Sequence, residues 1–205
     1  MEEKKVRIGI IGGTFDPIHI GHLIIAQNAI SQYQLDRVLF IPTGQAPHKD
    51  NRYIVQSAHR LEMIRLSIKD NKDFFFSAME INEPTTSYTY LTLQQLKHLY
   101  PEWDLYFIMG ADSLDYFDQW YHPEIICAMA SILVAVRDQF DATAVNSKIE
   151  GIKAQFEADI RLIETPNVSV SSRDIRNRVA TNEPIRYLVT QAVEEYIERH
   201  DLYQS

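Results

Sequence analysis

Residues 6–22 read VRIGIIGGTFDPIHIGH. The first part, Val6–Ile11, is a short and almost continuous apolar run, which is typical of a strand covered on both faces. The glycine pair and the Asp-Pro step predict a loop, and apolar residues recur at helical spacing over Leu23–Tyr33. A strand, a loop and a helix in this order form the place where open α/β sheets bind ligands.

The same alternation continues to Pro166. Further strands are predicted at Val38–Ile41, Phe74–Ala78, Leu105–Met109, Ile132–Val136 and Ile160–Ile163, and further helices at Ala58–Ile68, Tyr90–Leu99 and within Thr143–Phe156. Such alternation indicates βαβ units and a parallel sheet. We therefore expect one Rossmann-like α/β domain over residues 1–205, with its core at residues 1–166 and a short helical C-terminal segment at residues 167–205.

Composition narrows the class of protein. The chain has 205 residues, of which 45% are hydrophobic and 23% charged, as in an ordinary globular domain. Acidic residues outnumber basic ones 28 to 20, which argues against general binding to nucleic acid. No long apolar stretch suits a signal peptide or a membrane span, so we expect a soluble cytoplasmic protein that binds no membrane. A homo-oligomer is compatible with this composition.

Cys127 is the only cysteine. The chain can therefore form no intramolecular disulfide and no cysteine-based zinc cluster. Its neighbours are apolar, which predicts a buried thiol rather than a nucleophile.

The loop Gly12–His22 has the features of a phosphate site. Gly12 and Gly13 permit positive φ angles and a close approach of backbone N–H groups to an anion. The helix that begins near His19–His22 would point its positive end into the same cleft. Residues three apart share a helix face, so both imidazoles are expected to donate hydrogen bonds to a phosphate.

Two other nucleotide-binding motifs are absent. The chain has neither G-x-G-x-x-G nor G-x-x-x-x-G-K-[ST], which argues against a dinucleotide oxidoreductase and a P-loop NTPase. No acid or third histidine lies at matching spacing beside the two histidines, so no protein-held metal is predicted there.

A second motif follows Pro166. Val170–Arg176 reads VSSRDIR, in which Ser171 is expected to cap a helix and Asp174 to complete a capping box. The N-terminus of that helix would suit phosphates, and Arg176 projects one turn further along. Pro184 is predicted to lie in the first turn of the last helix, where its missing N–H costs nothing.

These motifs together resemble a known family. Gly12–His22 is similar to the signature of the HxGH nucleotidyltransferases, and Val170–Arg176 resembles their second motif, I-S-S-T-x-I-R. Pro47–Lys49, Ser87–Thr89, and Gly110–Asp112 with Trp120-Tyr121 resemble the bacterial nicotinate-nucleotide adenylyltransferases. The resemblance implies transfer of the adenylyl group of ATP to nicotinate mononucleotide, giving deamido-NAD and pyrophosphate in NAD biosynthesis.

The resemblance also implies the roles of residues. His19, His22 and Arg176 would be catalytic, with His22 nearer the transferring group. The ATP side would be formed by Gly12, Gly13, Thr14, Phe15, His19, His22, Asp112, Ser171, Ser172 and Arg176. The mononucleotide side would be formed by Asp16, His48, Lys49, Ser87, Tyr88, Thr89, Trp120 and Tyr121. Mg²⁺ would accompany ATP, held by phosphates and water.

The chain departs from the family pattern at two places. Arg173 stands where threonine is usual in the second motif, which removes one phosphate-binding hydroxyl. Arg137-Asp138-Gln139 stands where the family often continues Arg-Pro-Gly, which predicts a differently shaped loop on the adenine side.

The implied reaction fits these residue types. The 5′-phosphate of a mononucleotide is already an anion at pH 7, with a second pKa near ~6, so the reaction requires no strong base. It requires in-line placement and neutralisation of charge on the phosphates. Three alternatives stay open: a nicotinamide-mononucleotide or phosphopantetheine adenylyltransferase, and a non-catalytic nucleotide-binding module. An RNA-binding relative of the synthetases is disfavoured by the acidic charge.

Overall fold

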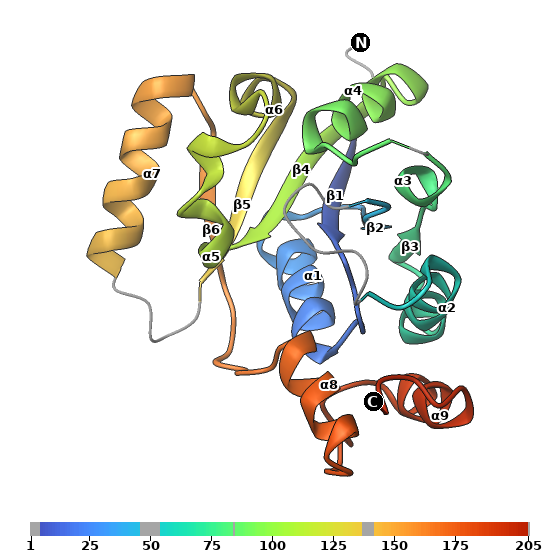
Figure 1. Cartoon of the computed structure of the whole chain (residues 1–205). Helices are drawn as coiled ribbons and strands as arrows, with labels where there is room; N and C mark the ends of the chain where they lie inside the picture. The colour runs from blue at the N-terminus through green and yellow to red at the C-terminus, as the bar shows by residue number, and fades with distance from the viewer. Residues whose placement is uncertain (1–4, 46–53, 84, 137–141, 205) are drawn as a thin grey trace.

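A six-stranded parallel sheet forms the centre of the computed structural model, which describes residues 5–45, 54–83, 85–136 and 142–204. The strand order is β3-β2-β1-β4-β5-β6 (Figure 1). The strands are β1 (Val6–Gly13), β2 (Arg37–Pro42), β3 (Phe74–Phe76), β4 (Trp103–Gly110), β5 (Ala130–Val136) and β6 (Ile160–Glu164). The predicted α/β fold with a parallel sheet is confirmed.

Helices cover both faces of this sheet. They are α1 (Ile20–Tyr33), α2 (Ser57–Ile68), α3 (Met79–Asn82), α4 (Thr89–Leu99), α5 (Ala111–Leu114), a 3-10 turn η2 (Phe117–Gln119), α6 (Pro123–Met129), α7 (Ala142–Phe156), α8 (Ser172–Ala180) and α9 (Gln191–Arg199). One buried cluster includes residues of α1, α2, α8 and α9, and the other includes residues of α4, α6 and α7. The C-terminal helices are therefore part of the core beside α1 and α2, as Figure 1 shows. Among the described residues, none of the helices has the length and apolarity that a membrane crossing requires.

The strand order reverses at β1. This strand pairs with β2 on one side and with β4 on the other, so the chain leaves β1 and β4 in divergent directions at their carboxyl ends. Ligands of open α/β sheets bind in the crevice at such a switch point. The topology therefore places the loop after β1 where a ligand is expected.

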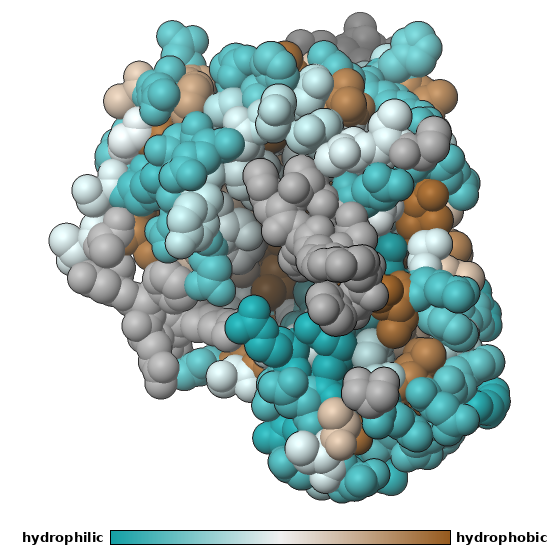
Figure 2. All heavy atoms as spheres, viewed as in Figure 1, coloured by the Kyte–Doolittle hydropathy of each residue, from teal (hydrophilic) through white to brown (hydrophobic). Residues whose placement is uncertain are grey.

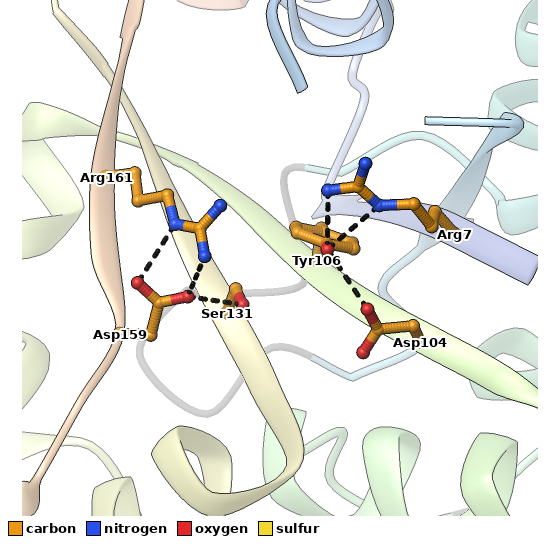
Figure 3. A network of polar contacts seen from close by, with 6 residues as sticks. All are labelled: Arg7, Asp104, Tyr106, Ser131, Asp159 and Arg161. Atoms are coloured by element: carbon orange, nitrogen blue, oxygen red, sulfur yellow. Dashed lines mark hydrogen bonds and ion pairs between the residues drawn. The ribbon is translucent and has the colours of Figure 1, made fainter. Parts of the chain in front are cut away.

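The amino ends of the strands carry a polar network instead (Figure 3). Arg7 donates two hydrogen bonds to the Tyr106 hydroxyl, at 3.0 and 2.8 Å, and that hydroxyl donates to Asp104. Arg161 and Ser131 both donate to the Asp159 carboxylate. Every member has a partner in the network, which fits a structural role at the end of the sheet away from the switch point.

Two predictions about local structure are wrong. The strand predicted at Phe74–Ala78 ends at Phe76, because Ala78 already caps helix α3. The last helix begins at Gln191 rather than near Pro184. The segment after Pro184 is non-helical: Tyr187 has a left-handed φ of 68°, and the Leu188 carbonyl accepts from the N–H of Ile20 in α1.

Strand β2, which lies next to β1, supports the ligand-side loop through Phe40. Its ring is fully buried, 6.0 Å from the ring of Phe15 and 5.3 Å from that of Phe74. We expect Phe40→Ala to lower the free energy of unfolding by about 3–5 kcal/mol, because it removes a buried ring and leaves a cavity. Urea denaturation measures this. Leu99→Ala, at a side chain that is 55% exposed, is the control and should change stability by less than about 0.5 kcal/mol. A loss below about 1 kcal/mol for Phe40→Ala would contradict the packing role.

Candidate active site

The loop between β1 and α1 makes a tight, buried turn. Phe15 has a positive φ of 49° and is 2% exposed, and the peptide bond between Asp16 and Pro17 is cis. None of the seven glycines has a positive φ, so this part of the glycine prediction is wrong. Gly12 and Gly13 lie in β1 and line a cavity, where the lack of a side chain leaves the backbone accessible. The left-handed turn that we expected at the glycines is made by Phe15, which the core holds in place.

The two predicted histidines lie together at the start of α1. His19 caps the helix, and its backbone N–H donates to Nδ1 of His22 at 3.2 Å. The two rings stack with their centroids 3.7 Å apart. Because Nδ1 of His22 accepts a hydrogen bond, the neutral ring carries its proton on Nε2. His22 can thus offer an N–H donor to an anion.

Two amides at this helix end are already bonded. The Ile20 N–H, the first of helix α1, donates to the carbonyl of Leu188, and the His22 N–H donates to the carbonyl of His19, each at 3.0 Å. The anion site expected at the helix N-terminus would therefore exclude these two amides. It would depend mainly on the imidazole of His22.

The second predicted motif contacts this loop directly. The Ser172 hydroxyl donates to the Pro17 carbonyl at 2.9 Å, and Nη1 of Arg176 donates to the Asp16 carbonyl at 2.7 Å. The side chain of Arg176 is about one third exposed, so its remaining N–H groups can reach a ligand. The fold thus joins two motifs that lie about 160 positions apart. Figure 2 shows a largely hydrophilic surface over α8 and α9 at this end of the molecule.

Helix α8 begins as predicted, with one difference. Ser171 is the N-cap, and its hydroxyl accepts from the Asp174 N–H at 3.1 Å. The Asp174 carboxylate, which a capping box would direct back to Ser171, accepts from Nε of Arg178 at 2.9 Å.

Asp16, predicted to bind the mononucleotide, is buried. Its side chain is 3% exposed and accepts a hydrogen bond from the Tyr203 hydroxyl at 2.8 Å. Its other carboxylate oxygen lies 3.8 Å from Nη1 of Arg176. A direct contact between this carboxylate and a ligand stays a prediction, and it would require the Tyr203 hydrogen bond to be exchanged.

Sequence reasoning missed Arg60 of helix α2. This arginine is 3% exposed, and its Nη1 donates to the Thr14 carbonyl at 2.7 Å. Burial lowers the pKa of Arg60, while the charge of Asp16 acts in the opposite direction. No local signal separates Arg60 from Arg65 of the same helix, which is exposed and pairs with Glu62.

A cavity of about 260 Å³ lies beside the loop. Eight predicted site residues line it: Gly12, Gly13, Thr14, Ser87, Tyr88, Thr89, Trp120 and Tyr121. Trp120 is half-buried, with its ring 6.0 Å from Phe107 and 5.5 Å from Phe117. The cavity therefore brings together residues predicted for both substrates.

Of the predicted site residues in the described part of the chain, eight do not line this cavity: Phe15, Asp16, His19, His22, Asp112, Ser171, Ser172 and Arg176. Asp112 is exposed in the first turn of α5, at the carboxyl end of β4. His48 and Lys49 lie outside the described residues, as do Arg137, Asp138 and Gln139.

Glu80 is a second residue that sequence reasoning missed. It lines the cavity from helix α3 and accepts a hydrogen bond from the Thr92 hydroxyl at 2.7 Å. Burial raises the pKa of the Glu80 carboxyl, and hydrogen bonds from Thr92 and Ser87 oppose this shift. The segment around Glu80 carries no motif that would have indicated a cavity position.

The prediction for Cys127 is confirmed. The thiol is 9% exposed, and burial raises its pKa to about 11. Almost none of it is a thiolate at neutral pH, which excludes a role as nucleophile.

Gly44 joins the loop after β2 to the cavity wall. Its N–H donates to the Ser87 hydroxyl at 3.1 Å, and the Ser87 N–H donates to the Gln45 carbonyl at 3.0 Å. A Cβ atom at Gly44 would lie 2.1 Å from the backbone oxygen of Glu80. Only glycine fits between these two backbone segments.

We expect Gly44→Ala to lower the free energy of unfolding by about 1–3 kcal/mol, because the clash is with backbone. Urea denaturation measures the change. Gly151→Ala is the matched control: a Cβ there meets nothing within 4 Å, and alanine should stabilise helix α7 by about 0.5–1 kcal/mol. Equal stability of wild type and Gly44→Ala would show that this contact is not tight.

Comparison with known proteins identifies the family. The model of the cytidylyltransferase-like family matches residues 10–178, which include the loop after β1 and Arg176. A probable nicotinate-nucleotide adenylyltransferase of Desulfitobacterium hafniense is 39% identical over 198 residues, covering 97% of this chain and 96% of its own. One of Caldicellulosiruptor saccharolyticus is 42% identical over 200 residues, covering 98% and 100%.

Solved structures share the fold. The nicotinic acid mononucleotide adenylyltransferase of Plasmodium falciparum complexed with NaAD superposes with a TM-score of 0.79 at 21% identity, covering 96% of this chain and 97% of its own. The same enzyme complexed with APC gives a TM-score of 0.76. With its two phosphate motifs joined at the switch point of the sheet, the chain belongs to the cytidylyltransferase-like family.

Proposed function

We propose that this protein transfers the adenylyl group of ATP to nicotinate mononucleotide, giving nicotinate adenine dinucleotide and pyrophosphate in NAD biosynthesis. The observation that carries the proposal is the cavity that joins Gly12–Thr14 to Ser87–Thr89 and Trp120, with the paired histidines at the other end of the loop that begins at Gly12. Curated relatives with that name cover nearly the whole chain. A structural neighbour is described as complexed with NaAD.

The reaction is a direct in-line displacement. An oxygen of the mononucleotide 5′-phosphate forms a bond to the α-phosphorus of ATP, and the bond from that phosphorus to the bridging oxygen of pyrophosphate breaks. The attacking group is already an anion, so the protein supplies position and charge neutralisation rather than a base. His22 would donate from Nε2, next to the transferring group, with His19 stacked against it and Arg176 facing the other phosphates.

Further residues would hold ATP through backbone and hydroxyl groups. Phe15 contributes only its backbone, since its side chain is buried against Phe40. Ser171 and Ser172 would bring the N-terminus of α8 toward the β- and γ-phosphates, and Asp112 would meet the ribose. Mg²⁺ is proposed to arrive with ATP: the described residues include no group of three His, Cys, Asp or Glu side chains placed to hold a metal, which favours coordination by phosphates and water. The reaction is proposed to take place in the cytoplasm.

The pyridine side of the proposal rests on the rest of the cavity. Trp120 and Tyr121 offer aromatic surface for the ring. Among the described residues, those that line the cavity include no Lys or Arg, so the nicotinate carboxylate would be received by amides at the start of α4, near Tyr88 and Thr89. His48 and Lys49 are proposed for the mononucleotide phosphate.

The role of His22 is tested by substitution. We expect His22→Ala to lower kcat about 10²–10³-fold, as for a lost donor to a transition-state oxyanion, while the fold stays intact. Pyrophosphate release measures turnover, and circular dichroism checks the fold. His98→Ala, at an exposed histidine of α4, is the control and should leave kcat unchanged. Near-normal turnover of His22→Ala would rule out its contact with the transferring group.

The acceptor is tested by comparing substrates. With ATP and Mg²⁺, we expect pyrophosphate release to be fastest with nicotinate mononucleotide, because helix amides favour a carboxylate over a neutral amide. Nicotinamide mononucleotide and phosphopantetheine are the comparison acceptors. A preference for either of them would overturn the nicotinate assignment, and ATP binding without turnover on any acceptor would indicate a non-catalytic module.

A further inference from the structure

The C-terminal end of the chain reaches the phosphate loop. The Tyr203 hydroxyl donates to Oδ1 of Asp16 at 2.8 Å, across 187 positions of sequence. Asp16 is 3% exposed, so water reaches this carboxylate hardly at all. Tyr203 therefore supplies a hydrogen bond that solvent does not replace easily.

The packing after helix α9 holds Tyr203 in this place. Leu202 is 8% exposed and belongs to the same buried cluster as Phe15 and Ile175. Its N–H donates to the Ile197 carbonyl at 3.1 Å, which closes the end of the helix. Tyr203 has a positive φ of 65°, an uncommon conformation for a bulky residue that persists only where the surroundings enforce it.

Two arginines act on the charge of the Asp16 carboxylate. Arg60 donates to the Thr14 carbonyl and Arg176 to the Asp16 carbonyl, each at 2.7 Å. Arg176 is also 3.8 Å from the carboxylate, which is too long for a hydrogen bond but close enough for attraction. Asp16 thus competes with any bound phosphate for the exposed N–H groups of Arg176.

The Tyr203 hydroxyl limits this competition. A buried carboxylate needs hydrogen-bond donors, and one that loses a donor draws in the nearest cation. Here that cation is Arg176, whose Nη1 lies 3.8 Å from the carboxylate. Burial raises the pKa of the Tyr203 hydroxyl, and the charge of Asp16 adds to the shift, so the group stays a protonated donor at neutral pH.

We propose that Tyr203 is a positioning residue for ATP: its hydroxyl satisfies the Asp16 carboxylate and so leaves Arg176 available to the triphosphate. The proposal rests on the role of Arg176 in the proposed function. It concerns the ATP half of the site, and it takes the Asp16 carboxylate as the partner of Tyr203 instead of the ligand of the mononucleotide that the sequence predicts.

The test is Tyr203→Phe, which removes one oxygen and keeps the ring. We expect the KM for ATP to rise at least about tenfold, as for the loss of a hydrogen bond to a charged group, and the KM for the acceptor to change less than about twofold. Pyrophosphate release at varied ATP and varied acceptor gives both constants. Tyr100→Phe is the matched control, because that ring stacks on Trp103 at the amino end of β4, and both constants should stay unchanged.

A double-mutant cycle separates positioning from stability. Asp16→Asn keeps an oxygen that accepts from Tyr203 but removes the charge that attracts Arg176. In that background Tyr203→Phe should raise the KM for ATP by less than about twofold further. Tm is measured for all four proteins.

Two results would overturn the proposal: a lower Tm of Tyr203→Phe with both KM values unchanged, or a full tenfold effect that persists beside Asp16→Asn. A failure of the proposed function is seen separately. If the wild-type protein uses another acceptor, the same KM measurements are made with that acceptor. If it uses none of the acceptors, the affinity for ATP is measured by calorimetry and compared between the same variants.

Discussion

A buried carboxylate at the base of the phosphate loop constrains the rest of this structure. An uncompensated charge in a protein interior costs several kcal/mol, so Asp16 requires partners. They come from three distant parts of the chain: Arg60 of α2, Arg176 of α8 and Tyr203 after α9. The C-terminal helices therefore hold the loop that lies between β1 and α1.

The two halves of the site are built on different physical principles. On the phosphate side, two guanidinium groups fix two backbone carbonyls of the turn, and the imidazole of His22 is oriented by a backbone N–H. Such preorganised donors need no rearrangement when charge develops on a phosphate. On the other side, aromatic and hydroxyl groups line an open cavity, and the backbone contacts around Gly44 fix its wall.

The sequence predicted much of this arrangement, and its failures have a common cause. Periodicity located all six strands, and the family resemblance assigned the loop after β1 and the motif at Val170–Arg176 to one site, where the structure shows them in contact. The local helix signal at Pro184 failed because Tyr187 adopts a left-handed conformation and the Leu188 carbonyl bonds to the start of α1. The sequence could not single out Arg60 or Glu80, because a buried and an exposed charge look alike in a helical segment. No sequence pattern indicated the role of Tyr203, because its hydrogen-bond partner Asp16 lies 187 positions away.

By itself, the sequence determined the class of fold and the place of the loop after β1, because these follow from local periodicity and short motifs. The tertiary structure decided which groups hold that loop. It assigned the left-handed turn to Phe15 instead of the glycines and turned the Asp16 carboxylate toward Tyr203. The physical reason is that burial and hydrogen-bond partners of a charged group depend on segments far apart in the chain, which only packing brings together.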